Sequence, residues 1–307
     1  MHRRTFLERA GLVLGGLVLG SVPRACAAAA SEKISVVDAA GRTVSVTVPV
    51  QRVVLMFDYE EFIAVGGSHA FDRVVGYSKT VWYDWRRSIW ERYAAVIPNL
   101  AQLPDVGYTD DSTFSAEKVI ALRPDVFITP RWEFTSMQQG ASQIAAAGIP
   151  IVVIDYNAQQ VPTHVASTLV MGQLLGMDAR ARQLAALYGA KVADVQARVA
   201  RATTPRPKVY VELGQGGPSV YGNSYSDDLW GPLIETSGGI NIAKGRVNDS
   251  PLSPEYILAS NPDYIFITGS TWPNSPQAVE MGFGVSPALT NARLRAYLAR
   301  PGWSGLS

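Results

Sequence analysis

Beyond residue 30, the hydrophobic pattern of the chain alternates between strands and helices. Residues 34–48 alternate apolar and polar side chains on both sides of Ala40-Gly41, which predicts a β-hairpin. Short apolar runs bounded by turn residues predict further strands at 52–56, 73–77, 126–129, 149–154, 208–213 and 264–268. Helices are predicted at 58–66, 136–147, 163–175 and 227–237. Strands alternating with helices predict an α/β fold with parallel sheets.

The longest predicted helix has Asp178 as its N-cap and runs to about residue 202. Its apolar positions recur at spacings of three and four: Leu184, Leu187, Tyr188, Val192, Val195 and Val199. About 25 helical residues extend for roughly 37 Å, which is enough to run along two small lobes. Residues 203–207, which include two prolines, form the clearest linker.

One stretch of the sequence occurs twice. Residues 112–129 and 250–268 share six residue types at identical positions, 138 residues apart: Ser112, Ser115, Glu117, Ala121, Pro124 and Asp125. Each copy predicts a short helix with an N-cap serine (Ser115 or Ser253), then a Pro-Asp turn and a strand covered on both faces. Such a motif can recur by chance in α/β proteins, but a match of this length favours a duplicated lobe.

The composition of the chain limits the classes of function that it can have. With 307 residues and 47% apolar side chains, the chain is long enough for one or two domains with sizeable cores. Its formal charge of +1 gives no reason to expect a nucleic-acid partner. The single Cys26 excludes a disulfide framework and a thiolate metal cluster. No stretch after the N-terminus has the length and apolarity of a membrane span.

Residues 1–30 have the features of an export signal that is cleaved near Ala30. Arg3-Arg4 precedes a short apolar run over 10–22 and a zone of small residues. The arginine pair resembles a twin-arginine signal, and general secretion is the alternative. Lipid anchoring at Cys26 is less favoured because Pro23-Arg24-Ala25 lacks the apolar residue that such a site requires. We expect a periplasmic protein.

Several of these features together resemble the bacterial periplasmic solute-binding proteins for iron complexes and cobalamin. The features are the hairpin with Asp38, Gly41 and Arg42, the strand at 52–54, and the two Ser-x-Glu…Pro-Asp copies. The resemblance extends from residue 34 to the end. It implies a class III periplasmic binding protein fold, in which two α/β lobes are bridged by a long helix and the ligand lies in the cleft between them. The implied parts are the N-terminal lobe with its hairpin (31–177), the linking helix (178–203) and the C-terminal lobe (204–307).

The chain departs from the family pattern after Pro301-Gly302-Trp303. Members usually continue into another strand and closing helices, whereas this sequence stops at Ser307. The C-terminal lobe is therefore expected to be truncated, with apolar surface and unpaired backbone groups at its sheet.

The resemblance also implies partners. Family members act as monomers that deliver a ligand to the permease of an ABC importer and its ATPase, and a glutamate of each lobe meets basic residues of the permease. These glutamates correspond to Glu117 and Glu255. In the alternative interpretation, both are helix-start carboxylates without a partner.

Ligands of open α/β sheets bind beyond the carboxyl ends of the strands. The side chains predicted there or in adjacent long loops are Tyr59, Trp82, Tyr83, Trp85, Arg86, Tyr108, Arg131, Trp132, Tyr156, Tyr221, Tyr225 and Trp272, with Phe57, Asp58 and Glu212 as further candidates. Aromatic side chains provide flat contact area and arginine pairs with anionic oxygens, which suits a metal chelate. A ferric siderophore is the leading ligand, ahead of cobalamin, haem or an oxyanion such as molybdate. Any of these aromatic side chains can instead belong to the core or the rim.

A metal site of the protein's own and an enzymatic function are disfavoured. Only His69 and His164 lie outside the export signal, so a site with several histidines is not available. The chelator wraps the iron, and no cofactor is expected. An exported α/β enzyme is the alternative from another class, but the chain has neither a Gly-x-Ser-x-Gly elbow nor a phosphate loop. A binding protein that serves a sensor is a third hypothesis.

Overall fold

The computed structural model describes residues 31–272 and 274–306. The predicted export signal, including its arginine pair and Cys26, lies outside the described residues. Within the described ranges, none of the helices has both the length and the apolarity needed to cross a membrane.

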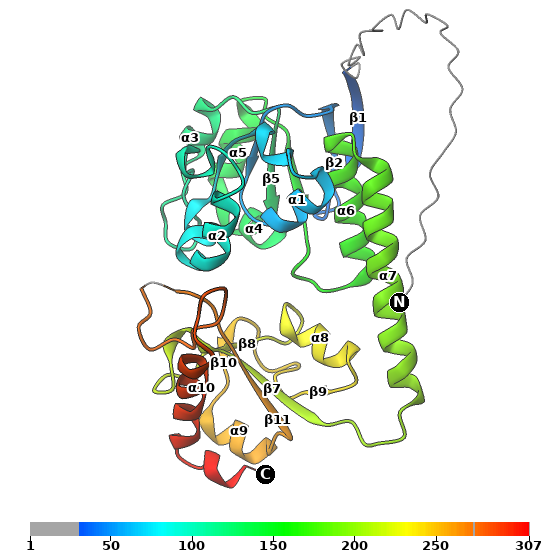
Figure 1. Cartoon of the computed structure of the whole chain (residues 1–307). Coiled ribbons are helices and arrows are strands. Elements are labelled where there is room, and N and C mark those ends of the chain that lie inside the picture. Colours follow the sequence, from blue (N-terminus) through cyan, green and yellow to red (C-terminus); the bar gives the residue numbers. More distant parts are fainter. Residues whose placement is uncertain (1–30, 273, 307) are drawn as a thin grey trace, which may run out of the picture. The chain divides into compact units, whose positions relative to one another are not determined.

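The N-terminal lobe is built on a sheet of four parallel strands (Figure 1). In spatial order they are β4 (Val74–Tyr77), β3 (Val53–Leu55), β5 (Val126–Pro130) and β6 (Ile151–Ile154). The helices of this lobe are α1 (Tyr59–Gly66), α2 (Arg87–Ala94), α3 (Ala116–Ala121), α4 (Arg131–Met137), α5 (Gln139–Ala146) and α6 (Val161–Leu175). Short helical turns lie at Ala70–Arg73, Thr80–Asp84 and Leu100–Gln102. The predicted helix over 136–147 is thus two helices, because Gln138 has a φ of 39° that interrupts the helix.

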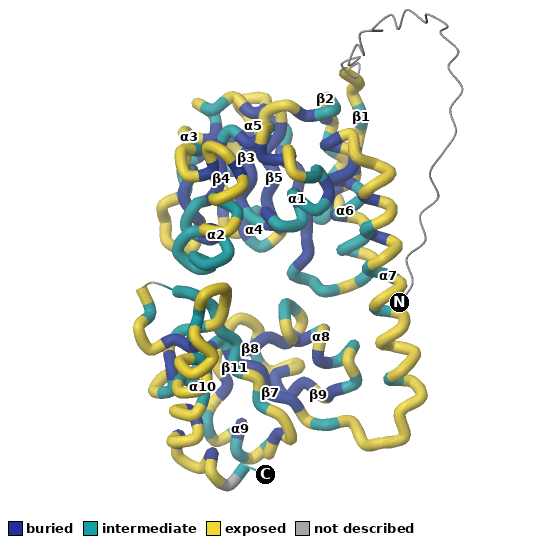
Figure 2. The backbone as a smooth tube through the Cα atoms, in the orientation of Figure 1, coloured by how far each residue is buried: buried dark blue, intermediate teal, exposed yellow. Residues whose placement is uncertain are grey.

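The strands of this sheet are buried on both faces, as predicted. Because side chains alternate along a strand, Val53 and Leu55 enter one core with α1 and α6, while Val54 enters a second core with α3 and α5. Every residue of β3, β5 and β6 is buried, and β3 and β5 are dark blue in Figure 2. The sheet therefore provides a rigid support for the side chains that follow its strands.

The predicted hairpin is confirmed as β1 (Glu32–Val37) paired antiparallel with β2 (Thr43–Val48). The Asp38 carboxylate accepts hydrogen bonds from the backbone N–H groups of Ala40 and Arg42, both at 3.0 Å, and pairs with the Arg42 guanidinium. Asp38 also accepts from Val153 N–H at 3.2 Å, and Arg42 donates to the Ile151 carbonyl at 3.0 Å. The turn thus attaches the hairpin to β6.

The long helix is α7 (Asp178–Arg201), with 24 residues. Its N-cap is Met177, so the prediction of Asp178 as the cap is wrong by one residue. The close approach of α7 to α6 explains Gly172, since a Cβ there would lie 2.3 Å from that of Ala181. Much of α7 is exposed (Figure 2), including two predicted stripe residues, Leu187 at 56% and Val195 at 39%.

The C-terminal lobe contains a sheet of three parallel strands. In spatial order they are β11 (Tyr264–Thr268), β7 (Lys208–Leu213) and β9 (Ile240–Asn241). A separate two-residue pair joins β8 (Asn223–Ser224) to β10 (Ser250–Pro251), and the helices are α8 (Trp230–Thr236), α9 (Pro254–Ser260) and α10 (Pro287–Ala296). Helical turns lie at Gly214–Gly216, Tyr297–Ala299 and Trp303–Gly305.

The burial of β11 differs from the prediction. Among the described residues β11 is an edge strand, and Tyr264 and Phe266 are 57% and 56% exposed. The prediction of a strand covered on both faces therefore holds for β5 but is wrong for β11.

The duplicated stretch forms the same local structure in both lobes. In the first copy, the Ser115 hydroxyl accepts a hydrogen bond from Lys118 N–H at 3.2 Å at the start of α3. In the second copy, the Ser253 hydroxyl accepts from Tyr256 N–H at 3.2 Å at the start of α9. Both predicted N-caps are confirmed.

The repeated aspartate fastens each helix–strand unit to the neighbouring strand. The Asp125 carboxylate accepts from the N–H groups of Gln51 and Arg52 at 2.8 and 2.9 Å, and Asp125 N–H donates to the Arg52 carbonyl at 2.8 Å. The Asp263 carboxylate accepts from Lys208 N–H at 2.7 Å, and Asp263 N–H donates to the Lys208 carbonyl at 2.9 Å. We call this reciprocal pairing the aspartate clamp.

A basic side chain at each clamped strand also caps the helix of the repeat. Arg52 donates to the carbonyls of Leu122 and Arg123, at 2.7 and 3.1 Å, beyond the end of α3. Lys208 donates to the carbonyl of Ser260, the last residue of α9, at 2.9 Å. Cations stabilise the carbonyls at helix C-termini. The duplication therefore includes this basic position, although the two side chains differ.

Removing the clamp is expected to destabilise the protein. Asp125→Ala leaves two backbone N–H groups without their acceptor, so we expect a loss of about 1–2 kcal/mol in the free energy of unfolding. Asp125→Asn retains an acceptor oxygen and should lose less. The measurement is urea unfolding followed by far-UV circular dichroism, with Asp194→Ala in the exposed ion pair of α7 as the control. Equal midpoints for Asp125→Ala and Asp194→Ala would contradict the role of the clamp.

Candidate functional site

The carboxyl ends of β3 and β5 bring two short segments together. Phe57 and Asp58 follow β3, and Trp132 and Glu133 lie in the first turn of α4, directly after β5. Because the two parallel strands are neighbours in the sheet, these segments meet at one edge. The rings of Phe57 and Trp132 are 5.9 Å apart, edge to face.

Four aromatic rings form a continuous row at this edge. Trp132 packs against Tyr108 at 5.7 Å between ring centroids, and Tyr108 packs against Trp85 at 5.1 Å. At the other end of the row, the Arg86 guanidinium lies 5.4 Å from the centre of the Phe57 ring. We call Phe57, Trp132, Tyr108 and Trp85 the aromatic row. The structure thus brings together four of the predicted ligand residues, namely Trp85, Arg86, Tyr108 and Trp132.

Several polar atoms around the aromatic row are buried without a hydrogen-bond partner among the described residues. They are Asp58 Oδ2, both carboxyl oxygens of Glu133, Nε and Nη2 of Arg86, and Nε1 of Trp132. A buried polar atom without a partner costs about 1–3 kcal/mol, so such atoms are rare in folded proteins. They belong to four residues beside the aromatic row, in which Tyr108 is buried and Phe57, Trp85 and Trp132 are half-buried. The half-buried rings are the part of the row that a ligand can touch.

The backbone of Asp58 is also unusual. Its φ and ψ are 58° and 40°, in the left-handed region, and it occupies the N-cap position of α1 without a side-chain capping bond. An aspartate at an N-cap normally accepts a hydrogen bond from the first turn of the helix. Here one carboxyl oxygen remains unpartnered instead. Residues held in such conformations concentrate at functional sites.

Burial changes the acidity of both carboxyl groups. Removal from water raises the pKa of Asp58 well above its ordinary value, and the nearby Glu61 raises this pKa further. Burial likewise raises the pKa of Glu133, with Asp110 and Asp58 adding to the effect. The Arg86 guanidinium opposes the shift at Asp58, but it also pairs with Glu60 at 3.1 Å. Both carboxyl groups therefore hold protons at higher pH than they would in water.

Two of the predicted ligand residues belong to the core. Tyr59 and Trp82 are fully buried and stack at 4.5 Å between ring centroids. The Tyr59 hydroxyl lies against the carbonyls of Met56 and Ser78, and the Trp82 indole donates to Glu60 at 3.1 Å. The prediction that these two rings line a ligand surface is corrected, because neither has an exposed face.

Tyr83 and Tyr156 do not join the aromatic row. The Tyr83 ring lies 3.5 Å from the Arg87 guanidinium and packs edge-on against Trp90. Tyr156 is buried, and its hydroxyl shares a hydrogen bond of 3.1 Å with Thr168. Both side chains therefore have structural partners.

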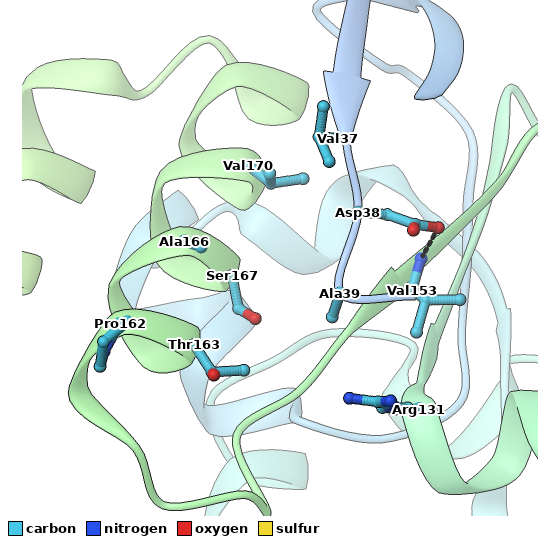
Figure 3. A pocket seen from close by; sticks show the side chains of 10 residues that line it. All are labelled: Val37, Asp38, Ala39, Arg131, Val153, Pro162, Thr163, Ala166, Ser167 and Val170. Carbon is cyan, nitrogen blue, oxygen red and sulfur yellow. Dashed lines mark hydrogen bonds between the residues drawn. The ribbon is translucent and has the colours of Figure 1, made fainter. Parts of the chain in front are cut away.

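Arg131 faces a different space from that of its neighbour Trp132. It lines a pocket of about 250 Å³ whose other lining residues come from the end of β1, from β6 and from α6 (Figure 3). Its guanidinium is 3.9 Å from the Asp155 carboxylate, and its side chain is 61% exposed. Consecutive helical positions point in different directions, which explains why the predicted Arg131-Trp132 pair does not act on one surface.

The three aromatic candidates of the C-terminal lobe have separate surroundings. Tyr221 packs against Trp303 at 6.2 Å between ring centroids, and Tyr225 is buried. Trp272 is half-buried in the loop after β11. The preceding residue, Thr271, accepts a hydrogen bond from Ser88 N–H at 3.1 Å, so this loop contacts the segment that contains Trp85 and Arg86.

Glu212 is not available to a ligand. Its carboxylate forms two hydrogen bonds with the Arg300 guanidinium, at 2.7 and 2.8 Å, and both residues are buried. The rings of Tyr221, Tyr297 and Trp303 lie within 4.6 Å of the same guanidinium. Sequence reasoning missed Arg300 because 88 residues separate it from Glu212. Glu133 was missed as well, although it lies only three residues after the end of β5.

The histidines and the predicted docking residues lie elsewhere. His69 pairs with Asp72 on the surface at 3.1 Å, and His164 stacks on Tyr188 at 4.5 Å. Within the described part of the chain, no group of three His, Cys, Asp or Glu residues is arranged to hold a metal ion. Glu117 and Glu255 are exposed in the first turns of α3 and α9.

Comparisons with known proteins identify relatives. A family model described as "Periplasmic binding protein" matches residues 58–292. A cobalamin-binding protein of Halobacterium salinarum is 28% identical over 184 residues, which are 58% of this chain and 46% of the relative. An uncharacterized ABC transporter substrate-binding lipoprotein of Bacillus subtilis, YvrC, is 23% identical over 159 residues, which are 52% and 50% of the two chains. The chain thus spans about half the length of the curated relatives it matches.

A solved structure is similar over most of the chain. The TroA-like periplasmic binding protein FepB of Veillonella parvula has a TM-score of 0.78 and 35% identity, covering 89% of this chain and 80% of its own. The predicted fold, with two α/β lobes joined along the chain by a long helix, is thereby confirmed.

Glu133→Gln is expected to stabilise the protein at neutral pH. The folded chain holds the Glu133 proton more tightly than the unfolded chain does, so stability is lost as the pH rises above 4.5, the ordinary glutamate pKa. Removing the charge should restore about 1–3 kcal/mol, or roughly 2–4 °C in Tm for each kcal/mol. Thermal unfolding between pH 4.5 and pH 8 should show that the difference in Tm between Glu133→Gln and the unmodified protein grows as the pH rises. The exposed Glu32→Gln is the control, and a lower Tm for Glu133→Gln at neutral pH would contradict the assignment.

Proposed function

The chain belongs to the periplasmic binding protein family, and we propose that it is the extracytoplasmic solute-binding component of an ABC importer that captures a metal chelate. The observation that carries this proposal is the aromatic row with unpartnered polar atoms at the ends of β3 and β5. The protein is a substrate-binding protein and not an enzyme, in keeping with its family.

A ferric siderophore is the leading ligand in this proposal. Its chelating groups enclose the iron, so the protein needs to contribute only flat contact area and hydrogen-bonding groups, which the aromatic row and its surroundings offer. Cobalamin is the second candidate, because one relative is named as a cobalamin-binding protein.

The remaining parts have the following roles in the proposal. The lobes at 31–177 and 204–307, joined by the helix at 178–203, hold the chelate between them in the periplasm. Glu117 and Glu255 dock onto basic residues of the permease, which works with its ATPase. Their equivalent places in the two repeats, together with their exposure, support this role.

Intrinsic fluorescence tests the class of ligand. Trp85 and Trp132 belong to the aromatic row, so a bound ferric chelate is expected to quench the emission of the purified protein. Titrations with a ferric siderophore, cobalamin, haem and molybdate compare the four classes. Saturable quenching by the siderophore supports the proposal. Trp132→Ala is expected to weaken the affinity for the siderophore at least tenfold, because it removes an aromatic contact with the ligand. Absence of quenching by any ferric siderophore would remove the leading ligand.

A double charge reversal tests the docking role. Glu117→Arg combined with Glu255→Arg is expected to abolish uptake of labelled chelate into cells while leaving affinity unchanged, because like charges would then face each other at the permease. The matched control is Glu32→Arg with Asp178→Arg, which reverses two exposed carboxylates outside the repeats. Undiminished uptake by the Glu117 and Glu255 variant would show that these residues do not dock.

A further inference from the structure

Two short stretches that follow β11 are fastened to each other in the C-terminal lobe. Ser270 N–H donates to the Val279 carbonyl at 3.2 Å, and Met281 N–H donates to the Ser270 carbonyl at 3.3 Å. Val279 is fully buried in the core of this lobe. The neighbouring residues, at 271 and 282–283, therefore have a fixed place on the C-terminal lobe.

The first stretch caps a helix of the N-terminal lobe. Helix α2 has Arg86 at its N-cap position, and a guanidinium cannot accept hydrogen bonds from the free N–H groups of the first turn. The Thr271 hydroxyl is an acceptor there, because it lies 3.1 Å from Ser88 N–H. It also donates to Ser88 Oγ at 3.3 Å, and the Ser270 hydroxyl donates to the Trp85 carbonyl. Three hydrogen bonds thus join the start of α2 to the other lobe.

The second stretch contacts the same face of α2. A Cβ atom at Gly282 would lie 2.5 Å from Ser88 Oγ, so a side chain at this position would displace the serine hydroxyl. The Arg92 guanidinium lies 4.0 Å from the centre of the Phe283 ring. Ser88 and Arg92 are four positions apart and are therefore neighbours on the helix surface. We call Ser270, Thr271, Gly282 and Phe283 the interlobe clasp.

The interlobe clasp holds one end of the aromatic row. Trp85 and Arg86 directly precede α2, and the half-buried Trp85 ring packs against Tyr108 at 5.1 Å between centroids. The backbone that carries Trp85 is held by Ser270 at its carbonyl and by Thr271 at the helix that follows. We propose that the interlobe clasp positions Trp85 for contact with a ligand and slows the release of that ligand. The inference rests on the proposed function for its ligand, whereas the contact between the lobes can be tested without one.

The interlobe clasp can open while both lobes stay folded. Its four residues are exposed or half-buried, and segments with few buried contacts open locally at low cost. A single hydrogen bond changes an equilibrium constant by about tenfold or less. Val279, which fastens the clasp to its own lobe, is fully buried and stays in place. Opening therefore frees Ser88 and Trp85, and closing restores the cap of α2.

An engineered disulfide tests the contact between the lobes. The hydroxyl oxygens of Ser88 and Thr271 are 3.3 Å apart, so sulfur atoms in their places are within reach of a bond. Cys26→Ser removes the only cysteine of the chain. In this background, Ser88→Cys with Thr271→Cys is expected to lose both free thiols on mild oxidation with diamide. Ser45→Cys with Thr271→Cys, which uses an exposed serine of the hairpin, is the matched control. A cross-link that forms no faster than in the control overturns the inference.

The accessibility of Trp85 tests the positioning. Thr271→Val keeps the shape of the side chain and removes the acceptor for Ser88 N–H. We expect the part of the emission that Trp85→Phe removes to become about twice as accessible to acrylamide, because the backbone before α2 loses a hydrogen bond that holds it. Thr47→Val, at an exposed threonine of the hairpin, is the control. A merely structural role of Thr271 would lower stability without singling out this tryptophan, and unchanged quenching overturns the positioning.

Rates of release connect the interlobe clasp to binding. Bound ferric siderophore is expected to leave the oxidised Ser88→Cys and Thr271→Cys protein about tenfold more slowly than the Cys26→Ser protein, because a closed loop blocks exit from a site. Thr271→Val should release the siderophore faster than the unmodified protein. Stopped-flow dilution, followed by the recovery of tryptophan emission, measures these rates.

The outcomes separate this inference from the proposed function. Equal release from the cross-linked and the uncross-linked protein overturns the control of release and leaves a chelate-binding protein. If folded Cys26→Ser protein binds no ferric siderophore, the leading ligand falls, and the cross-link and the quenching of Trp85 still decide the inference. A protein that forms the cross-link and exposes Trp85 in Thr271→Val supports it, and failure of either measurement overturns it.

Discussion

The aspartate clamp determines how the site is assembled. By exchanging hydrogen bonds with Arg52, Asp125 sets where β5 begins relative to β3, so that Val53 pairs with Val126 and Leu55 with Ile128. The strand ends, and the residues that follow them, are aligned as a result. A shift of one residue in this register would turn every side chain of β5 to the opposite face. The contact between Phe57 and Trp132 therefore depends on an interaction at the far end of the same strands.

The same clamp in the C-terminal lobe acts in different surroundings. Asp263 holds β11 to β7 as Asp125 holds β5 to β3. However, β5 lies between β3 and β6, whereas β11 is at the edge of its sheet among the described residues. The clamp consequently determines register and direction but not burial, since burial depends on what covers the faces and the other edge. The two copies of the motif thus form the same local hydrogen bonds, but their strands differ in exposure to solvent.

Features that depend on local contacts could be predicted from the sequence, whereas features that depend on distant segments could not. The N-caps Ser115 and Ser253 depend on residues three positions apart, and the duplication displayed them twice. The expectation that ligands bind beyond the carboxyl ends of strands led to Trp132, because β5 is short and clearly bounded. The same rule could not separate Trp132 from the buried Trp82, because an aromatic residue after a strand suits a core as well as a surface. The pairing of Glu212 with Arg300 joins distant segments and leaves no local pattern.

Stability and binding are linked at the ends of β3 and β5. The unpartnered oxygens of Asp58 and Glu133 reduce the stability of the lobe. A ligand that partners these oxygens both binds and stabilises, because whatever binds only the folded state shifts the folding equilibrium toward it. Polar groups that the fold leaves unsatisfied thus connect the stability of this lobe with its function.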